Sequence, residues 1–262
     1  LICSSILSKK MAEGIDSLVL DVKCGLGAFM KTEAEARQLA ESLVAISTTM
    51  GKPTSAILTR MDEPLGHMIG NSLEVIESID CLKGKGPADL MEVTYALCAE
   101  MLIIGGIQSS KEGAMTALKG AIDSGTALEG FRALVEAQGG DGAVVDDYNC
   151  LPRTEKTKDI VLNNHSTMYV EGLDARSFGD AACILGAGRV STDSIIDPAV
   201  GIELLKKVGQ AVQPDEAIVR IHYQGIDSLE AAESRLKKAI KLSSEKPVVA
   251  SLIIDRISRE KC

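Results

Sequence analysis

The hydrophobic and polar positions of the first 60 residues follow a strand, helix and strand pattern. Residues 17–22 form a short run of aliphatic and β-branched side chains, and residues 53–59 form a second one. The helical pattern between them begins at Thr32, which has the capping-box spacing to Glu35, and Gly51 is a natural stop. Units of this kind build parallel sheets, so this part of the chain is predicted to be α/β.

The rest of the chain divides into a helical stretch and a mixed one. Helix starts between Asn71 and Gly139 are marked by Asn71 with Glu74, Pro87, Ser109 with Glu112, and Thr126 with Glu129. The helical periodicity fails at residues 141–152. Beyond it, strands are predicted at 160–162, 167–170, 217–222 and 248–254, and helices at 178–185 and 229–242. We therefore predict an α/β body over 1–155, with a mixed or parallel sheet and flanking helices, followed by an α+β domain over 156–262.

Composition and charge exclude two classes of partner. The 28 Lys and Arg against 37 Asp and Glu give a net charge of −9, and the chain has no Trp, 4 Tyr and 3 Phe, which disfavours nucleic-acid binding. Mean hydropathy is +0.13, and no apolar stretch approaches the roughly 20 residues of a membrane span, so we expect no membrane insertion. The 7 Cys include no CxxC pair, which indicates reduced, mostly buried thiols and a cytoplasmic location.

The opening residues carry the densest chemical signal. The chain starts without Met or a signal peptide, and we expect it to be a fragment that begins inside a domain. A helix is predicted from Ser4 or Ser5, as its N-cap, to Gly14. It places Ser5 and Lys9 on one face and turns Leu7 into a core. A hydroxyl and an ammonium together suit a planar ligand with carbonyl oxygens that gains negative charge as it leaves. The alternative is an ordinary solvated lysine.

Sequence motifs along the whole chain support a resemblance. They are Ser5-Ile6-Leu7-Ser8-Lys9-Lys10, the run from Asp21 to Phe29, the run from Leu58 to Gly66, Gly70 to Val75, Leu82 to Leu90, Leu185-Gly186-Ala187-Gly188-Arg189, and Val200-Gly201-Ile202. In this order they resemble the thymidine phosphorylase and pyrimidine-nucleoside phosphorylase family. The resemblance implies a pentosyltransferase that converts a pyrimidine nucleoside and inorganic phosphate into free base and pentose 1-phosphate, without an organic cofactor and as a homodimer.

The family's base site maps onto the opening helix. By resemblance, Ser5 and Lys9 hydrogen-bond the polar edge of the base, and Lys9 is the catalytic residue that offsets the charge of the departing base. Ile2, Ile6 and Phe29 correspond to the apolar walls around the ring, although ordinary core packing is the other interpretation. The resemblance also makes residues 1–14 the last helix of a helical lobe.

A potassium ion is the second implication of the resemblance. Its ligands in bacterial relatives map to the backbone carbonyls of Leu65 and Met68 and to the carboxylate of Glu77. The alternative for Glu77 is an exposed helix carboxylate. Gly25-Leu26-Gly27 is a weak match to a phosphate-binding loop, and the resemblance makes it a hinge-side loop instead.

Several alternatives stay open at this point. The resemblance implies that phosphate-binding loops and an Arg for the base lie outside this chain, so we expect the fragment alone to be inactive. The competing interpretations are a related phosphoribosyltransferase, a binding module with the hairpins of biotinyl and lipoyl domains, and a degenerate homologue without catalysis. Preference between thymidine and uridine is left open.

Overall fold

Two compact units make up the protein. The computed structural model describes residues 2–189 and 191–258, so Leu1 and Cys262 lie outside the described residues. Unit 1 comprises residues 1–62, 89–121 and 251–262, and unit 2 comprises 63–88 and 122–250. The predicted boundary near residue 155 falls inside a continuous segment of unit 2. The division into compact units therefore differs from the predicted division at residue 155. As a boundary between family domains, residue 155 stays a prediction.

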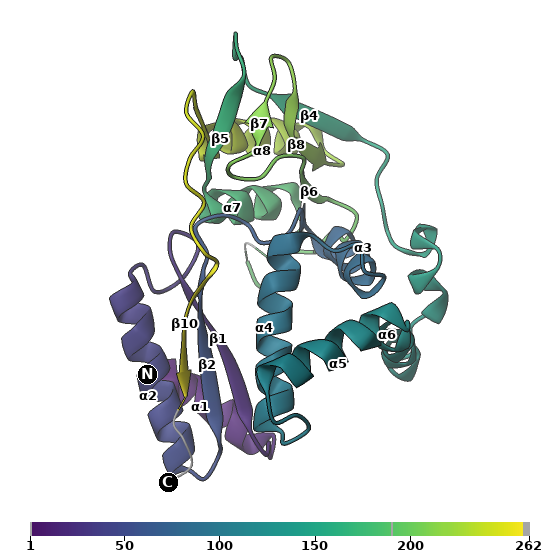
Figure 1. Ribbon diagram of the computed structural model, residues 1–262. Helices are drawn as coiled ribbons and strands as arrows, with labels where there is room; N and C mark the ends of the chain where they lie inside the picture. Colours follow the sequence, from purple (N-terminus) through teal and green to yellow (C-terminus); the bar gives the residue numbers. More distant parts are fainter. Residues whose placement is uncertain (1, 190, 259–262) are drawn as a thin grey trace. The chain divides into compact units, whose positions relative to one another are not determined.

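Unit 1 is built around a three-stranded sheet in the order β1-β2-β10 (Figure 1). Its elements are α1 (Ile2–Ala12), β1 (Leu18–Cys24), α2 (Glu33–Thr49), β2 (Thr54–Arg60), α4 (Ala88–Ile104), most of α5 (Lys111–Asp123) and β10 (Ile253–Ser258). Strands β1 and β2 are parallel, with Leu18 opposite Thr54. Helix α2 packs Ala36, Ala40 and Val44 against buried Val22 and Leu58. The predicted α/β unit is confirmed.

The C-terminal strand corrects one prediction. Residues 248–254 are predicted as a strand of the second half, whereas the observed strand, β10, pairs antiparallel with β2 in unit 1. Two ion pairs fix it there: Arg37 with Asp255, and Arg256 Nε with Glu100 Oε1 at 2.5 Å. The two residues of each ion pair lie more than 150 positions apart in sequence. A local sequence pattern cannot predict such a pairing.

Unit 2 contains two further sheets, in the orders β3-β6-β8-β4 and β7-β5-β9. Its strands are β3 (Met68–Ile69), β4 (Thr157–Val161), β5 (Met168–Leu173), β6 (Gly201–Leu204), β7 (Ala211–Val212), β8 (Ala217–His222) and β9 (Ile240–Ser243). Its helices are α3 (Asn71–Leu82), α6 (Thr126–Ala137), α7 (Ala175–Leu185) and α8 (Ile226–Ala239), with short 3-10 turns at Gly142–Val145 and Tyr148–Cys150. Phe178, Ile202, Ile221 and Leu236 are fully buried in its main core. An α+β arrangement here agrees with the predicted fold class.

Helix boundaries differ from the predicted ones by a few residues. Asn71 is the first residue of α3 rather than its cap, which is Gly70, and Ser110 rather than Ser109 caps α5 by accepting a bond from Gly113 N. The predicted helix over 229–242 is α8, which ends at Ala239, because residues 240–243 pair with β5 as strand β9. Strands β3, β6, β7 and β9 are two to four residues long and too short to show a period.

The capping box of α2 is present and gives a direct test of the sequence reasoning. Thr32 Oγ1 accepts a bond from Glu35 N at 3.3 Å, and Glu35 Oε2 accepts one from Thr32 N at 3.1 Å. Thr32→Ala is expected to lower the free energy of unfolding by about 1 kcal/mol, measured by urea denaturation. Thr49→Ala is the control, because the Thr49 hydroxyl bonds Ala45 O inside the helix and caps nothing. Equal losses for the two variants would contradict the capping role.

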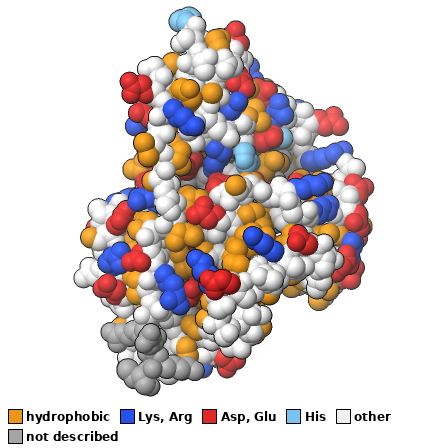
Figure 2. All heavy atoms as spheres, in the orientation of Figure 1, with side chains coloured by type: hydrophobic (Ala, Val, Ile, Leu, Met, Phe, Trp, Pro, Cys, Tyr) orange, Lys and Arg blue, Asp and Glu red, His pale blue; other side chains and the backbone are white. Residues whose placement is uncertain are grey.

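Charged side chains are spread over the surface, and most of the described cysteines are partly or fully exposed. Acidic and basic side chains are interspersed with apolar ones over the face shown in Figure 2. None of the helices in residues 2–189 and 191–258 is long and apolar enough to cross a membrane. The six described cysteines are free, but only Cys24 is buried, so the prediction of mostly buried thiols is wrong. Burial raises the pKa of the Cys24 thiol, which keeps it protonated at neutral pH.

Candidate active site

Helix α1 presents Ser5 and Lys9 together, as predicted. Both side chains are exposed and lie one turn apart on the same face, while Leu7 is 3% exposed and packs inward. Lys9 also lies in the last turn of the helix, where a cation interacts favourably with the helix dipole. The arrangement offers an ammonium and a hydroxyl from one rigid element to a ligand that approaches α1.

The predicted helix cap is wrong. Helix α1 already includes Ile2 and Cys3, so Ser4 and Ser5 lie inside it and neither is the N-cap. Their hydroxyls are preferred at caps, but Ile2, Ile6 and Leu7 follow a helical spacing that continues the pattern toward the N-terminus. Gly14 does end the segment, at a positive φ of 73°. Ser5 therefore owes its exposure to its place on the helix face and not to a cap position.

The three predicted wall residues differ in exposure. Ile2 and Ile6 are half-buried on α1, whereas Phe29 lies on the loop between β1 and α2 with 82% of its surface exposed. Core packing is therefore excluded for Phe29 within the described chain. An exposed aromatic ring in this loop is free to cover a ligand.

The loop after β1, which contains Gly25-Leu26-Gly27, is held by a hydrogen bond to Asp62. Leu26 N donates to Asp62 Oδ1 at 2.9 Å, and Gly27 N donates to Met61 O at 2.8 Å. Gly25 has φ 123°, and a Cβ there would lie 2.4 Å from Asp62 Oδ1, so glycine is required. The loop amides thus already donate to protein oxygens beside a carboxylate. This agrees with the interpretation that Gly25-Leu26-Gly27 is not a phosphate-binding loop.

A polar cluster on the neighbouring strands was missed by the sequence reasoning. The Thr59 hydroxyl donates to Asp21 Oδ1 at 2.5 Å and accepts from Lys23 Nζ at 3.1 Å, and Lys23 also forms an ion pair with Asp21. Asp21 and Lys23 share one face of β1, opposite the buried Val22 and Cys24. The sequence signal that could have predicted this cluster is the alternation of Asp21 and Lys23 with apolar residues in the predicted strand. The cluster links β1 to β2 beside the carboxyl ends of both strands.

The residues predicted for the cation meet in unit 2. Glu77 on α3 is 7% exposed, and its Oε1 accepts a bond from His67 N at 2.7 Å. The second oxygen, Oε2, lies 3.4 Å from Met68 N, and a Cβ on Gly66 would lie 2.4 Å from it. The carboxylate is therefore held against the turn between Leu65 and Met68, which excludes the exposed-carboxylate alternative. A buried carboxylate held on this turn by backbone N–H groups is one oxygen donor of the kind a monovalent cation needs, and the Leu65 and Met68 carbonyls as further ligands stay a prediction.

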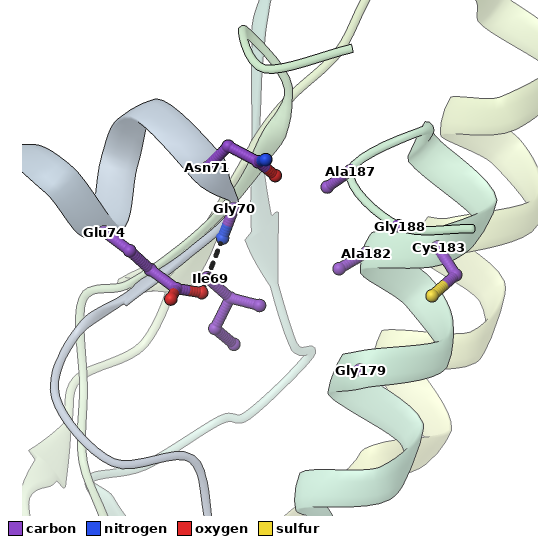
Figure 3. Close-up of a pocket in the computed structure, with 9 residues that line it drawn as sticks. All are labelled: Ile69, Gly70, Asn71, Glu74, Gly179, Ala182, Cys183, Ala187 and Gly188. Atoms are coloured by element: carbon purple, nitrogen blue, oxygen red, sulfur yellow. Dashed lines mark hydrogen bonds between the residues drawn. The ribbon is translucent and has the colours of Figure 1, made fainter. Parts of the chain in front are cut away.

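A separate pocket of about 380 Å³ opens beside the start of α3 (Figure 3). Asn71 faces Ala187 and Gly188 across it, and Glu74 accepts a bond from Gly70 N at 3.1 Å. Small side chains of α7 and the following turn form the opposite wall. The predicted helix stop after Leu185 is confirmed, because Gly186 adopts φ 106° there. None of the predicted site residues lines this pocket.

Comparisons with known proteins match both halves of the chain. Residues 2–128 match the family model of the glycosyl transferase family a/b domain, and residues 169–243 match that of the pyrimidine nucleoside phosphorylase C-terminal domain. Pyrimidine-nucleoside phosphorylase of Geobacillus stearothermophilus is 43% identical over 258 residues, which cover 98% of this chain and 59% of that protein. The Staphylococcus aureus (strain bovine RF122 / ET3-1) protein of the same name is 41% identical over 260 residues, covering 99% and 59%.

These matches include α1 of unit 1 and, separately, the turn beside Glu77 in unit 2. The chain spans about three fifths of the length of these relatives. The α1 helix and the turn that Glu77 holds both lie within the first matched range, and the α+β part of unit 2 carries the second. The chain therefore belongs to the pyrimidine-nucleoside phosphorylase family.

Proposed function

We propose that the protein to which this chain belongs catalyses the reversible phosphorolysis of pyrimidine nucleosides, with thymidine and uridine as substrates. In this reaction the bond between the base nitrogen and C1′ of the pentose breaks, and a phosphate oxygen forms the new bond to C1′. The electron pair of the broken bond passes to the base, whose carbonyl oxygens take up the charge. The products are free base and pentose 1-phosphate.

The observation that supports this proposal is the exposed pair on α1. Lys9 extends an ammonium and Ser5 a hydroxyl from the same face, and the buried Leu7 fixes the helix beneath them. A base that leaves with negative charge is bound more tightly than the neutral nucleoside by an ammonium. Lys9 thus lowers the barrier, and Ser5 orients the ring through its polar edge.

Apolar contacts supply the rest of the base site in this proposal. Ile2 and Ile6 lie on α1, and Phe29 is 82% exposed on the loop that Asp62 pins. Flat bases require apolar surfaces against their faces as well as donors at their edges. Phe29 gains burial when a base binds, which favours it as one of these surfaces.

A potassium ion is proposed at the turn formed by residues 65–68. The carbonyls of Leu65 and Met68 and the carboxylate of Glu77 would hold it, and the ion would supply a positive charge that keeps the turn folded around Glu77. We infer no organic cofactor. We also propose that the full protein is cytoplasmic and, as the resemblance implies, a homodimer.

The experiment is a phosphorolysis assay of thymidine and uridine with inorganic phosphate. We expect release of free base and pentose 1-phosphate by the full-length protein, and no turnover by the 262-residue chain on its own, because the resemblance places the phosphate site outside it. Turnover by the 262-residue chain would overturn the second expectation. Absence of turnover by the full-length protein would favour a degenerate homologue that binds without catalysis.

A related phosphoribosyltransferase is the alternative enzyme. The match of residues 169–243 to the C-terminal domain of pyrimidine nucleoside phosphorylases supports the phosphorylase instead. Assaying the same protein with free pyrimidine and 5-phosphoribosyl diphosphate separates the two, because a phosphorylase produces no nucleotide.

A further inference from the structure

Lys207 reaches into the turn that Glu77 holds, although 130 residues separate the two in sequence. Its side chain is 13% exposed, and its ammonium donates to Gly66 O at 3.0 Å and to Pro64 O. The Glu63 carboxylate lies 3.7 Å away. A lysine this buried requires compensation of its charge, which the two carbonyls and the carboxylate provide.

The backbone that carries Lys207 is held in place. Lys207 N donates to Gln210 Oε1 at 2.9 Å, and Gln210 N donates back to Lys207 O at 3.1 Å. The preceding Lys206 N is bonded to Ile218 O of strand β8. The ammonium is thus delivered from a closed turn beside the sheet core and not from a mobile loop.

Together Lys207 and Glu77 hold one peptide group from both ends. The carbonyl of the Gly66–His67 peptide accepts from Lys207, and its N–H donates to Glu77 Oε1 at 2.7 Å. Lys207 also holds the Pro64 carbonyl, so the peptide groups before and after the Leu65–Gly66 peptide are both fixed. Fixing these neighbours fixes the direction of the Leu65 carbonyl, which is one of the proposed cation ligands.

The positive charge of Lys207 also affects which cation the turn can bind. Glu63 and Glu77 bring two negative charges to the turn, and Lys207 brings one positive charge. Removal of the ammonium would make the turn more negative by one charge, which favours a divalent over a monovalent cation.

We propose that Lys207 is a positioning residue that orients the 63–68 turn and sets its charge so that the turn binds a monovalent rather than a divalent cation. This inference rests on the cation site of the proposed function. It assigns to Lys207 an action through the Pro64 and Gly66 carbonyls, without contact with substrate.

The test measures the melting temperature of the full-length protein against KCl, NaCl and CaCl₂ at constant ionic strength. We expect K⁺ to stabilise the wild type more than Na⁺ or Ca²⁺, and Lys207→Met to lose the K⁺ effect and gain one from Ca²⁺. Lys206→Met is the matched control, since Lys206 pairs with Glu216 at 2.6 Å and does not contact the turn, and it should respond like the wild type. A Lys207→Met variant with the wild-type K⁺ response would overturn the proposal.

Glu63→Gln is a second variant, useful where Lys207→Met does not fold. It keeps the bonds from Lys207 to both carbonyls and raises the net charge of the turn by one. We expect about a tenfold higher apparent Kd for K⁺, read from the same melting curves. An unchanged Kd would overturn the charge argument. A wild type that catalyses phosphorolysis but shows no specific K⁺ stabilisation would overturn the cation site and this inference while leaving the proposed reaction intact.

Discussion

Lys9→Ala is expected to lower kcat/KM for phosphorolysis about 10²–10³-fold in the full-length protein. The ammonium acts on charge that develops while the glycosidic bond breaks, and the loss of one such donor typically costs a factor of this size. Because the gain arises in the transition state, kcat should fall more than KM rises. Steady-state kinetics with thymidine and uridine measure both constants.

The neighbouring Lys10 provides the control for this prediction. Its ammonium pairs with Glu13 Oε2 at 3.0 Å, on a different part of the α1 surface. Alanine is the best helix former, so neither substitution should disturb α1, and circular dichroism verifies this. We expect Lys10→Ala to retain activity within a factor of about two, as for a change at a surface ion pair. Equal activity of the Lys9→Ala and Lys10→Ala variants would make α1 a scaffold without a role in catalysis.

Local signals predicted the strand, helix and strand unit well. The capping box at Thr32 and the glycine stop at Gly51 fix α2 through bonds within a few residues, and the apolar runs on either side are long enough to identify two strands. The same holds for Ser5 and Lys9, whose common face follows from a spacing of four in any helix. The resemblance then supplied their roles, which spacing alone does not provide.

Contacts between distant segments could not be predicted from local patterns. Arg256 pairs with Glu100 across 156 residues, and Lys207 reaches Gly66 across 141. The periodicity of a segment determines which face is apolar, but not which distant side chain meets its polar face. Lys206 and Lys207 are also indistinguishable in sequence, and only the folded structure shows that Lys206 pairs with Glu216 whereas Lys207 donates to the Gly66 carbonyl.

Gly201→Ala is expected to destabilise unit 2 strongly. Gly201 begins β6, and a Cβ there would lie 2.2 Å from Ile69 O and 2.8 Å from Leu73 Cδ1. The backbone oxygen cannot move aside without breaking the pairing of β3 with β6, which joins Ile69 to Ile202. Overpacking against backbone is expected to cost ~3 kcal/mol of unfolding free energy, measured by urea denaturation. Met68 shares this pairing, so the cation response of the turn should weaken as well.

Gly130→Ala, in the same unit, is expected to raise the free energy of unfolding instead. Gly130 lies inside α6 with nothing within 4 Å of an added Cβ, so the substitution relieves the entropic cost of a glycine in a helix. A gain of about 0.5–1 kcal/mol is expected. The two variants carry the same added methyl group, and only the surroundings differ. Similar effects of both on stability would mean that strands β3 and β6 are not packed at Gly201, and that the turn they hold beside Glu77 is looser than its hydrogen bonds indicate.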